Sequence, residues 1–201
     1  MSVYLSARRW VQQRPFVIRG RKARYERFVR ECRLAPGERV LDVGAGRGGA
    51  LERFNDSNPI VALETSNRFR DAHISRPNIE FVVGDGRSLP FADAEMPVVF
   101  CNSVIEHVPL DERERFASEI RRVAQRYFVQ TPNRWFPIEP HYMLPLIQFI
   151  PAKLRRHLDD RIIRSYIELL DRRGLHELFP DAQIIEERRF GLTKSLMAVR
   201  R

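Results

Sequence analysis

A glycine-rich turn in this sequence carries residue types and spacings that could hold a cofactor. The turn lies in RVLDVGAGRGGALERF, which predicts a strand, a tight turn and a helix, and it centres on Gly44 and Gly46. Together with Gly49 these two fit G-x-G-x-x-G, the spacing that places a dinucleotide pyrophosphate at a helix N-terminus. Together with Asp42 and Gly48 they fit D-x-G-x-G-x-G, which belongs to a different cofactor loop. The turn alone does not decide between a dinucleotide and the cofactor of the second loop type.

Three acidic residues, each at the end of a predicted strand, help to decide between them. Asp42 precedes the glycines, and because a buried unpaired carboxylate is costly we expect it either to face a polar site or to cap the following turn. Glu64 follows Gly46 by 18 residues and could accept both hydroxyls of a ribose. Asp85, in G-D-G, could accept an exocyclic amine such as adenine N6. Three acids suit an adenosyl ligand better than a pyrophosphate, so the sequence favours S-adenosylmethionine over a nicotinamide dinucleotide.

Four motifs in chain order then resemble a known family. LDVGAGRGG, VALE, VVGDGRSLPF and CNSVIEHV look like motifs I to IV of class I S-adenosylmethionine-dependent methyltransferases. They most resemble the small-molecule group related to ubiquinone and menaquinone methyltransferases (methyltransferase type 11), and the match covers about residues 38–130. The resemblance implies a Rossmann-like, doubly wound, seven-stranded α/β sheet, mostly parallel, with an antiparallel last strand.

The resemblance also implies which residues would contact the cofactor. Glu64 would hold the ribose hydroxyls and Asp85 the adenine amine, while Asn102 would lie at the methionine and sulfonium end. The predicted cofactor-binding residues are Asp42, Gly44, Ala45, Gly46, Glu64, Thr65, Asp85, Gly86, Asn102 and Ser103.

Methyl transfer from a sulfonium needs an in-line approach of the nucleophile and, for some acceptors, a base. His107 and His141 are the candidate bases, since histidine titrates near pH ~6.5. The alternative for Glu106-His107 is that the pair closes hydrogen bonds around a turn, and the alternative for His141 is simple packing; we favour both alternatives. No cluster of His, Cys and acidic residues has metal-ligand spacing, so no metal is expected.

The methyl acceptor would meet an insertion after the fifth predicted strand. Residues 132–160 contain five of the thirteen prolines and several aromatic residues, which is typical of a lid or binding wall. Its predicted substrate-lining residues are Trp135, Phe136, Glu139 and Tyr142. This composition suits a small hydrophobic acceptor, quinone-like or lipid-linked. The strand-four sequence N-S-V-I lacks N/D-P-P-Y/F, which disfavours enzymes that methylate base amines or glutamine amides.

Positive charge is concentrated at the N-terminus. Residues 1–40 hold eleven Lys and Arg against three Glu, which accounts for +8 of the net charge of +9. A basic helical arm over residues 1–36 could rest on an anionic membrane surface, grip RNA in an RNA methyltransferase, or simply be solvated. A non-catalytic cofactor-binding domain is a further alternative. No apolar run approaches the ~20 residues that span a bilayer, and two cysteines cannot form a disulfide framework, so we expect a cytoplasmic protein.

Alternating strands and helices must position these residues within one domain of 201 residues. The domain would comprise the arm, a cofactor-binding half over 37–131, the insertion, and final helices with a closing hairpin over 161–201. Strands are predicted at 39–43, 59–64, 79–85, 97–103, 126–131, 182–189 and 195–200. Helices are predicted at 22–33, 66–74, from an Asp111 cap through Val123, at 162–170 and near 175–179.

Overall fold

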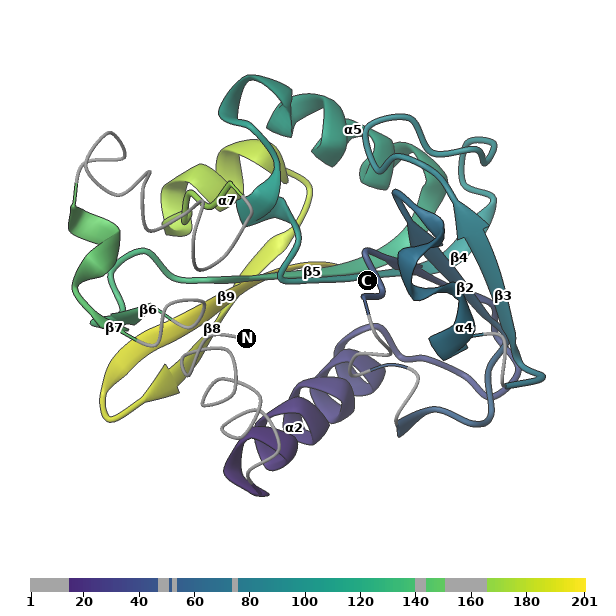
Figure 1. Cartoon of the computed structure of the whole chain (residues 1–201), viewed down its shortest axis with the longest axis horizontal. Helices are drawn as coiled ribbons and strands as arrows, with labels where there is room; N and C mark the ends of the chain where they lie inside the picture. Colours follow the sequence, from purple (N-terminus) through teal and green to yellow (C-terminus); the bar gives the residue numbers. More distant parts are fainter. Residues whose placement is uncertain (1–14, 47–50, 52–53, 74–75, 140–143, 151–165) are drawn as a thin grey trace.

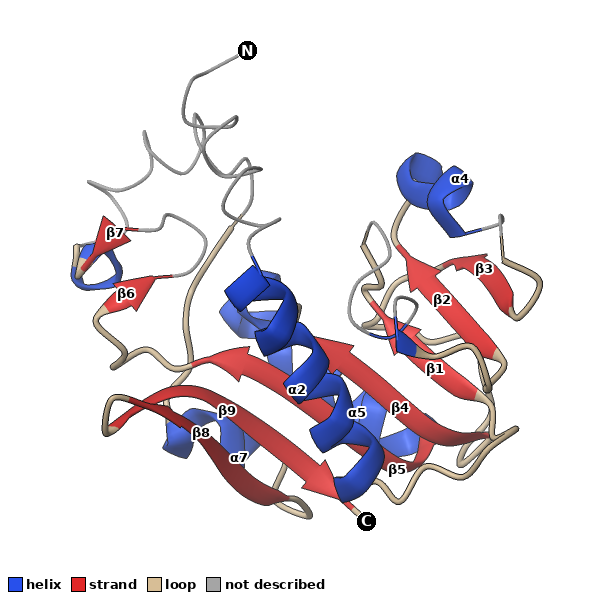
Figure 2. Cartoon of the chain, turned by 90° about the horizontal axis from the view of Figure 1, so that it is seen from below, coloured by secondary structure: helices blue, strands red, loops and turns tan. Residues whose placement is uncertain are grey.

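The computed structural model describes residues 15–46, 51, 54–73, 76–139, 144–150 and 166–201. Its centre is a seven-stranded sheet in the order β3-β2-β1-β4-β5-β9-β8 (Figures 1 and 2). The five strands from β3 to β5 are parallel, and β9 is antiparallel to both β5 and β8. The strands are β1 (Val40–Val43), β2 (Ile60–Glu64), β3 (Ile79–Val83), β4 (Met96–Asn102), β5 (Ala124–Pro132), β8 (Gln183–Arg189) and β9 (Leu192–Arg200). The predicted α/β sheet is confirmed.

The strand order reverses at β1, which pairs with β2 on one side and with β4 on the other. In open α/β sheets, ligands bind outside the carboxyl ends of the strands at such a reversal. The predicted acids lie at this edge of the sheet, because Asp42 is in β1, Glu64 ends β2 and Asp85 follows β3.

Helices cover both faces of the sheet (Figure 2). On one face, α2 (Pro15–Glu31) packs Phe28 against Phe100 and Phe128, and Cys32, just after the helix, belongs to the same buried cluster. On the other face lie α5 (Arg113–Val123) and α7 (Arg172–Leu178). From Val98 to Cys101, successive residues of β4 alternate between the two buried clusters, so its near-continuous apolar sequence follows from burial on both sides.

The predicted helices near residues 22–33, 66–74, 111–123 and 175–179 are present, but their ends differ from the prediction. The first described helix begins at Pro15, seven residues before the predicted start at residue 22, since proline is tolerated in the first helical turn. Ser66 does cap η1 (Asn67–Phe69), which α4 (Arg70–His73) follows. The predicted Asp111 cap is wrong: Asp111 lies inside η3 (Leu110–Glu112), and α5 starts after Glu112 with no side-chain cap.

The predicted helix over 162–170 is also wrong in its described part, residues 166–170. These residues are extended: Glu168 N–H donates to the Glu106 carbonyl at 2.9 Å, and Arg134 N–H donates to the Leu170 carbonyl at 2.9 Å. Ile167 and Leu169 are buried at alternate positions, which is the pattern of a strand rather than of a helix. Residues 162–165 lie outside the described part.

The insertion begins as a small hairpin in which β6 (Ile138–Glu139) pairs with β7 (Leu144–Pro145), and η4 (Ile147–Phe149) follows. The closing hairpin of β8 and β9 turns at Phe190 and Gly191, as predicted in kind. Among the residues described, no helix is long and apolar enough to cross a membrane.

Candidate cofactor site

The glycine turn after β1 approaches the end of β4 closely. Gly44 has φ 75°, and a Cβ on it would lie 2.4 Å from a methyl carbon of Val104, so only glycine fits. Gly46 also has positive φ, 65°, but a Cβ there would meet no atom within 4 Å. The turn therefore has free space on the side of Gly46 where a side chain would lie.

Glu64, at the end of β2, holds this turn in place. Its Oε1 accepts a short hydrogen bond from the Gly46 N–H. On the other side, the Gly46 carbonyl is 2.7 Å from His73 Nε2 of α4. Within the described part of the chain Glu64 Oε2 accepts no hydrogen bond, so it could accept from a ribose hydroxyl. Thr65, the next residue, is exposed.

Asp42 lies deeper than the other two acids. It is the third residue of β1, paired in register with Ala62 and Phe100, and only 3% of it is exposed. Ala45 in the following turn is also buried. A direct contact between Asp42 and the cofactor stays a prediction.

Asp85 is held by its own loop. Arg87 Nε lies 2.9 Å from Asp85 Oδ1 and 3.0 Å from Oδ2, and Arg87 Nη2 lies 2.6 Å from Oδ2. These hydrogen bonds hold the pKa of the Asp85 carboxyl below its ordinary value. An adenine amine at Asp85 would therefore share this carboxylate with a guanidinium.

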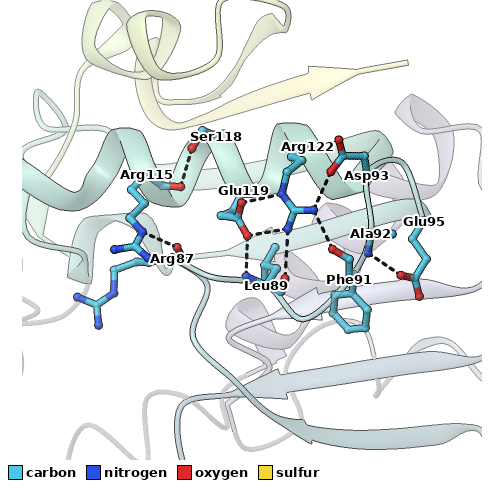
Figure 3. Close-up of polar contacts among 10 residues, drawn as sticks. All are labelled: Arg87, Leu89, Phe91, Ala92, Asp93, Glu95, Arg115, Ser118, Glu119 and Arg122. Atoms are coloured by element: carbon cyan, nitrogen blue, oxygen red, sulfur yellow. Dashed lines mark hydrogen bonds and ion pairs between the residues drawn. The ribbon is translucent and has the colours of Figure 1, made fainter.

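The loop that carries Asp85 is fastened to α5 (Figure 3). Arg122 donates to the carbonyls of Phe91, at 2.8 Å, and Leu89, at 3.2 Å, and it also pairs with Glu119. Glu119 in turn accepts from the Leu89 N–H at 2.7 Å. The helix thus fixes the position of Asp85 through backbone contacts that a motif search does not register.

At the end of β4, Ser103 adopts a left-handed conformation with φ 58°. Its N–H donates to the Gln130 carbonyl at 2.9 Å, and its hydroxyl donates to Gln130 Oε1 at 3.1 Å. Asn102, beside it, accepts a hydrogen bond on Oδ1 from Arg24 Nη1 at 3.0 Å. The structure thus brings Arg24 of α2 to the site, a residue that sequence reasoning missed.

His107 lies on η2 (Ile105–His107) with Nδ1 2.9 Å from the Tyr166 carbonyl. Its neighbour Glu106 is fully buried and accepts from the Thr131 hydroxyl at 3.1 Å. Both contacts agree with the alternative in which this pair closes hydrogen bonds around the turn, and a catalytic role for His107 stays a prediction. His141 lies outside the described residues.

The predicted acceptor wall is described in part. Trp135 is 62% exposed, and its ring centroid is 5.7 Å from that of Phe149. Phe136 is half-buried, and its carbonyl accepts from Gln148 Nε2 at 2.7 Å. Glu139 is on β6, its side chain outside the described part, and Tyr142 lies outside it altogether.

A groove of about 390 Å³ opens beside this wall. It lies between the carboxyl end of β5 and the β8–β9 hairpin, away from the glycine turn, and its lining includes Trp135, Arg172, Leu192 and Leu196. The groove therefore adjoins the predicted acceptor side rather than the predicted cofactor side.

The glycine turn, Glu64 and Asp85 together fit an adenosyl cofactor. Gly46 leaves free space where a side chain would lie, and Leu89 of the Asp85 loop is hydrogen-bonded to Glu119 of α5. Among the described residues, Glu64 Oε2 accepts no hydrogen bond. Carboxylates recognise hydroxyl and amine donors, as a ribose and an adenine present them.

Comparisons with known proteins agree. Residues 41–127 match the sequence family described as a methyltransferase domain. Over 109 residues the chain is 35% identical to a demethylmenaquinone methyltransferase of Renibacterium salmoninarum, a match that covers 53% of this chain and 45% of that protein. A similar match, 31% identical, covers 57% of this chain and 50% of a demethylmenaquinone methyltransferase of Beutenbergia cavernae. The chain thus spans about half the length of these curated relatives.

A solved structure extends the likeness to nearly the whole chain. The 1,6-didemethyltoxoflavin-N1-methyltransferase of Burkholderia thailandensis superposes with a TM-score of 0.61 at 15% identity, over 98% of this chain and 82% of that one. That likeness shows the fold. Residues 41–127 therefore form a methyltransferase domain, and the fold is that of class I S-adenosylmethionine-dependent methyltransferases, which the four motifs resemble. The methyl donor of this class is S-adenosylmethionine, which confirms the choice over a nicotinamide dinucleotide.

Proposed function

We propose that this protein transfers a methyl group from S-adenosylmethionine to a small hydrophobic acceptor, quinone-like or lipid-linked. The observation that carries the proposal is the Gly46 turn, which has free space at its Cβ position and is held by Glu64 at the strand-order reversal of a methyltransferase fold. When bound there, the cofactor supplies a methyl group already activated by a sulfonium. The protein has to bind the cofactor and the acceptor, orient them in line and shield them from water, since most of the rate gain in such a displacement comes from positioning.

Each residue then has a defined task. Glu64 Oε2 would accept from a ribose hydroxyl while Oε1 keeps the Gly46 N–H. Asp85 would accept from the adenine amine, and its anchored loop would fix the plane of that ring. The end of β4, at Asn102 and Ser103, would face the methionine end and set the direction in which the methyl group points.

The hydrophobic acceptor is supported by apolar side chains at one side of the groove. Trp135, Leu192 and Leu196 line it beside charged residues of α7 and β8, and Phe149 contacts Trp135. Phe190, at the nearby hairpin turn, is 91% exposed. Large exposed apolar side chains that lie together mark interaction sites. The similarity to two demethylmenaquinone methyltransferases also supports a quinone-like acceptor.

An anionic membrane surface would suit the same side of the molecule. Arginines flank the exposed apolar residues: Arg134 lies over the Trp135 ring at 6.0 Å, and Arg189 lies over the Phe190 ring at 5.5 Å. Apolar side chains bordered by cations are typical of proteins that rest on anionic lipid and reach a lipid-linked substrate. The cytoplasmic location stays a prediction.

Thermal melting with S-adenosylmethionine, S-adenosylhomocysteine and NADH in parallel tests the cofactor part of the proposal. Ligand at ~100 times its dissociation constant should add about 2.7 kcal/mol to the unfolding free energy. We expect both adenosyl ligands to raise the melting temperature and NADH to leave it unchanged. A shift with NADH alone would overturn the proposed function.

A further inference from the structure

The guanidinium of Arg24 is mostly buried beside the candidate cofactor site. Arg24 lies on α2, its side chain is 16% exposed, and it reaches across the end of β4 to Asn102. Burial lowers the pKa of this guanidinium, while the charges of Glu187 and Glu106 oppose the effect. Burying a cation is costly unless its charge and its N–H groups are matched by partners.

The partners of Arg24 in the described part of the chain leave this requirement unmet. Nη1 donates to Asn102 Oδ1 at 3.0 Å. Nη2 lies 3.7 Å from Glu187 Oε2, too far for a hydrogen bond, and Nε is buried with no hydrogen-bond partner.

Glu187 is already occupied elsewhere. It pairs with the Lys194 ammonium at 3.1 Å and accepts a short hydrogen bond from the Ser195 hydroxyl, both of them on β9. Because Glu187 is engaged by two other donors, it does not form a bidentate pair with the Arg24 guanidinium. The planar guanidinium, with its parallel N–H donors, could therefore bind another carboxylate in bidentate geometry. The site therefore offers a buried cation with spare donors at the edge where the cofactor would end.

We propose that Arg24 binds the α-carboxylate at the methionine end of the cofactor, with Asn102 orienting the guanidinium. The inference rests on the proposed function, which places the methionine end against Asn102. Arg24 then acts as a binding residue that selects ligands carrying the amino-acid carboxylate. It also gives α2 a task in ligand recognition that its basic composition alone does not specify.

Binding calorimetry with two ligands isolates this contact. S-adenosylhomocysteine carries the carboxylate, and decarboxylated S-adenosylhomocysteine lacks only that group. We expect the wild type to bind S-adenosylhomocysteine more tightly than the decarboxylated ligand. We expect Arg24→Met to lower the affinity for S-adenosylhomocysteine by about 10- to 100-fold, the range of a charge-assisted hydrogen bond. Affinity for the decarboxylated ligand should change less than about threefold. Arg24→Lys keeps the charge but loses the bidentate geometry of the guanidinium, so its affinity for S-adenosylhomocysteine should lie between those of the wild type and Arg24→Met.

Arg27→Met is the matched control. Arg27 lies one turn further along α2 and is also partly buried, but it donates to the Glu186 carbonyl and contacts the Met197 sulfur instead. We expect this variant to keep the wild-type preference for the carboxylate. Far-ultraviolet circular dichroism of each variant verifies that α2 and the sheet are folded.

The outcomes separate the inference from the function on which it rests. A preference for the carboxylate that survives in both Arg24 variants would overturn the inference, as would an equal loss of both ligands in Arg24→Met. Neither of these results would argue against S-adenosylmethionine as the cofactor. A wild type that binds neither ligand would overturn the proposed function, and the inference with it.

Discussion

At the scale of single residues, Glu64 does two things at once. One carboxylate oxygen holds the Gly46 N–H, and the other has no hydrogen bond in the described structure. In the proposed site, the same carboxylate would therefore determine both the conformation of the glycine turn and the affinity for the cofactor.

Replacing Glu64 separates these two tasks. Glu64→Gln keeps an acceptor for the Gly46 N–H but removes the charge that strengthens hydrogen bonds to a ribose. We expect S-adenosylhomocysteine to bind about tenfold more weakly by calorimetry, with the melting temperature of the free protein nearly unchanged. Glu80→Gln on β3 is the control, because Glu80 is exposed and pairs with Arg39 away from the glycine turn, and it should bind like the wild type. Unchanged affinity in Glu64→Gln would remove Glu64 from the site.

At the scale of elements, the loop after β3 depends on how closely it packs on α5. A Cβ on Gly86 would lie 2.4 Å from a ring carbon of Phe116 and 3.3 Å from a methyl carbon of Val43. Neither neighbour can move freely, because both belong to the buried core.

Gly86→Ala should therefore destabilise the protein. Overpacking of this kind costs about 1–3 kcal/mol, measured as unfolding free energy in urea. Gly20→Ala provides the opposite case, since Gly20 lies on α2 with open space around its Cβ position, and alanine there should stabilise by about 0.5–1 kcal/mol. Equal effects of the two substitutions would contradict the packing argument.

The elements also show what sequence reasoning could reach. Strands β1, β2 and β4 were predictable because each is a short apolar run that is almost entirely buried. Asp42 in β1 and Glu64 at the end of β2 stand out as acids in such runs. The Asp111 cap failed because a 3-10 turn precedes α5, and the 162–170 helix failed because long-range backbone bonds hold Glu168 and Leu170 extended. Local patterns do not contain such contacts.

Arg24 shows the same limit within the site. It sits among eleven basic residues of the first forty, where composition predicts a solvated or phosphate-facing surface. The one local signal is that Arg24 and Phe28 are four residues apart and therefore share a helical face with the buried stripe. Its contact with Asn102 joins positions 78 residues apart in sequence, so only the folded chain reveals it.

At the scale of the whole molecule, the exposed apolar residues near the groove should mediate membrane contact. We expect the double variant Trp135→Ser, Phe190→Ser to bind vesicles containing anionic lipid about tenfold or more weakly than the wild type in a flotation assay, because two large apolar side chains no longer enter the interface. Its affinity for S-adenosylhomocysteine should not change.

Leu110→Ser is the control for that experiment. Leu110 is 56% exposed but lies on η3, away from the groove, so the variant should bind vesicles like the wild type. Equal binding by the wild type and the double variant, or binding that ignores the lipid charge, would argue against this surface as the membrane contact.

The chain just before and just after the insertion meets in the structure. Asn133 forms a parallel bridge with Leu170, and the Arg134 N–H donates to the Leu170 carbonyl at 2.9 Å. Because the closure entropy of a loop grows only with the logarithm of its length, segments of quite different size could span these joined ends at little cost to the sheet. A graft from another methyltransferase between Arg134 and Tyr166 would keep both this joint and the Glu168 N–H contact with the Glu106 carbonyl, and it offers a route to a new acceptor on the same cofactor half.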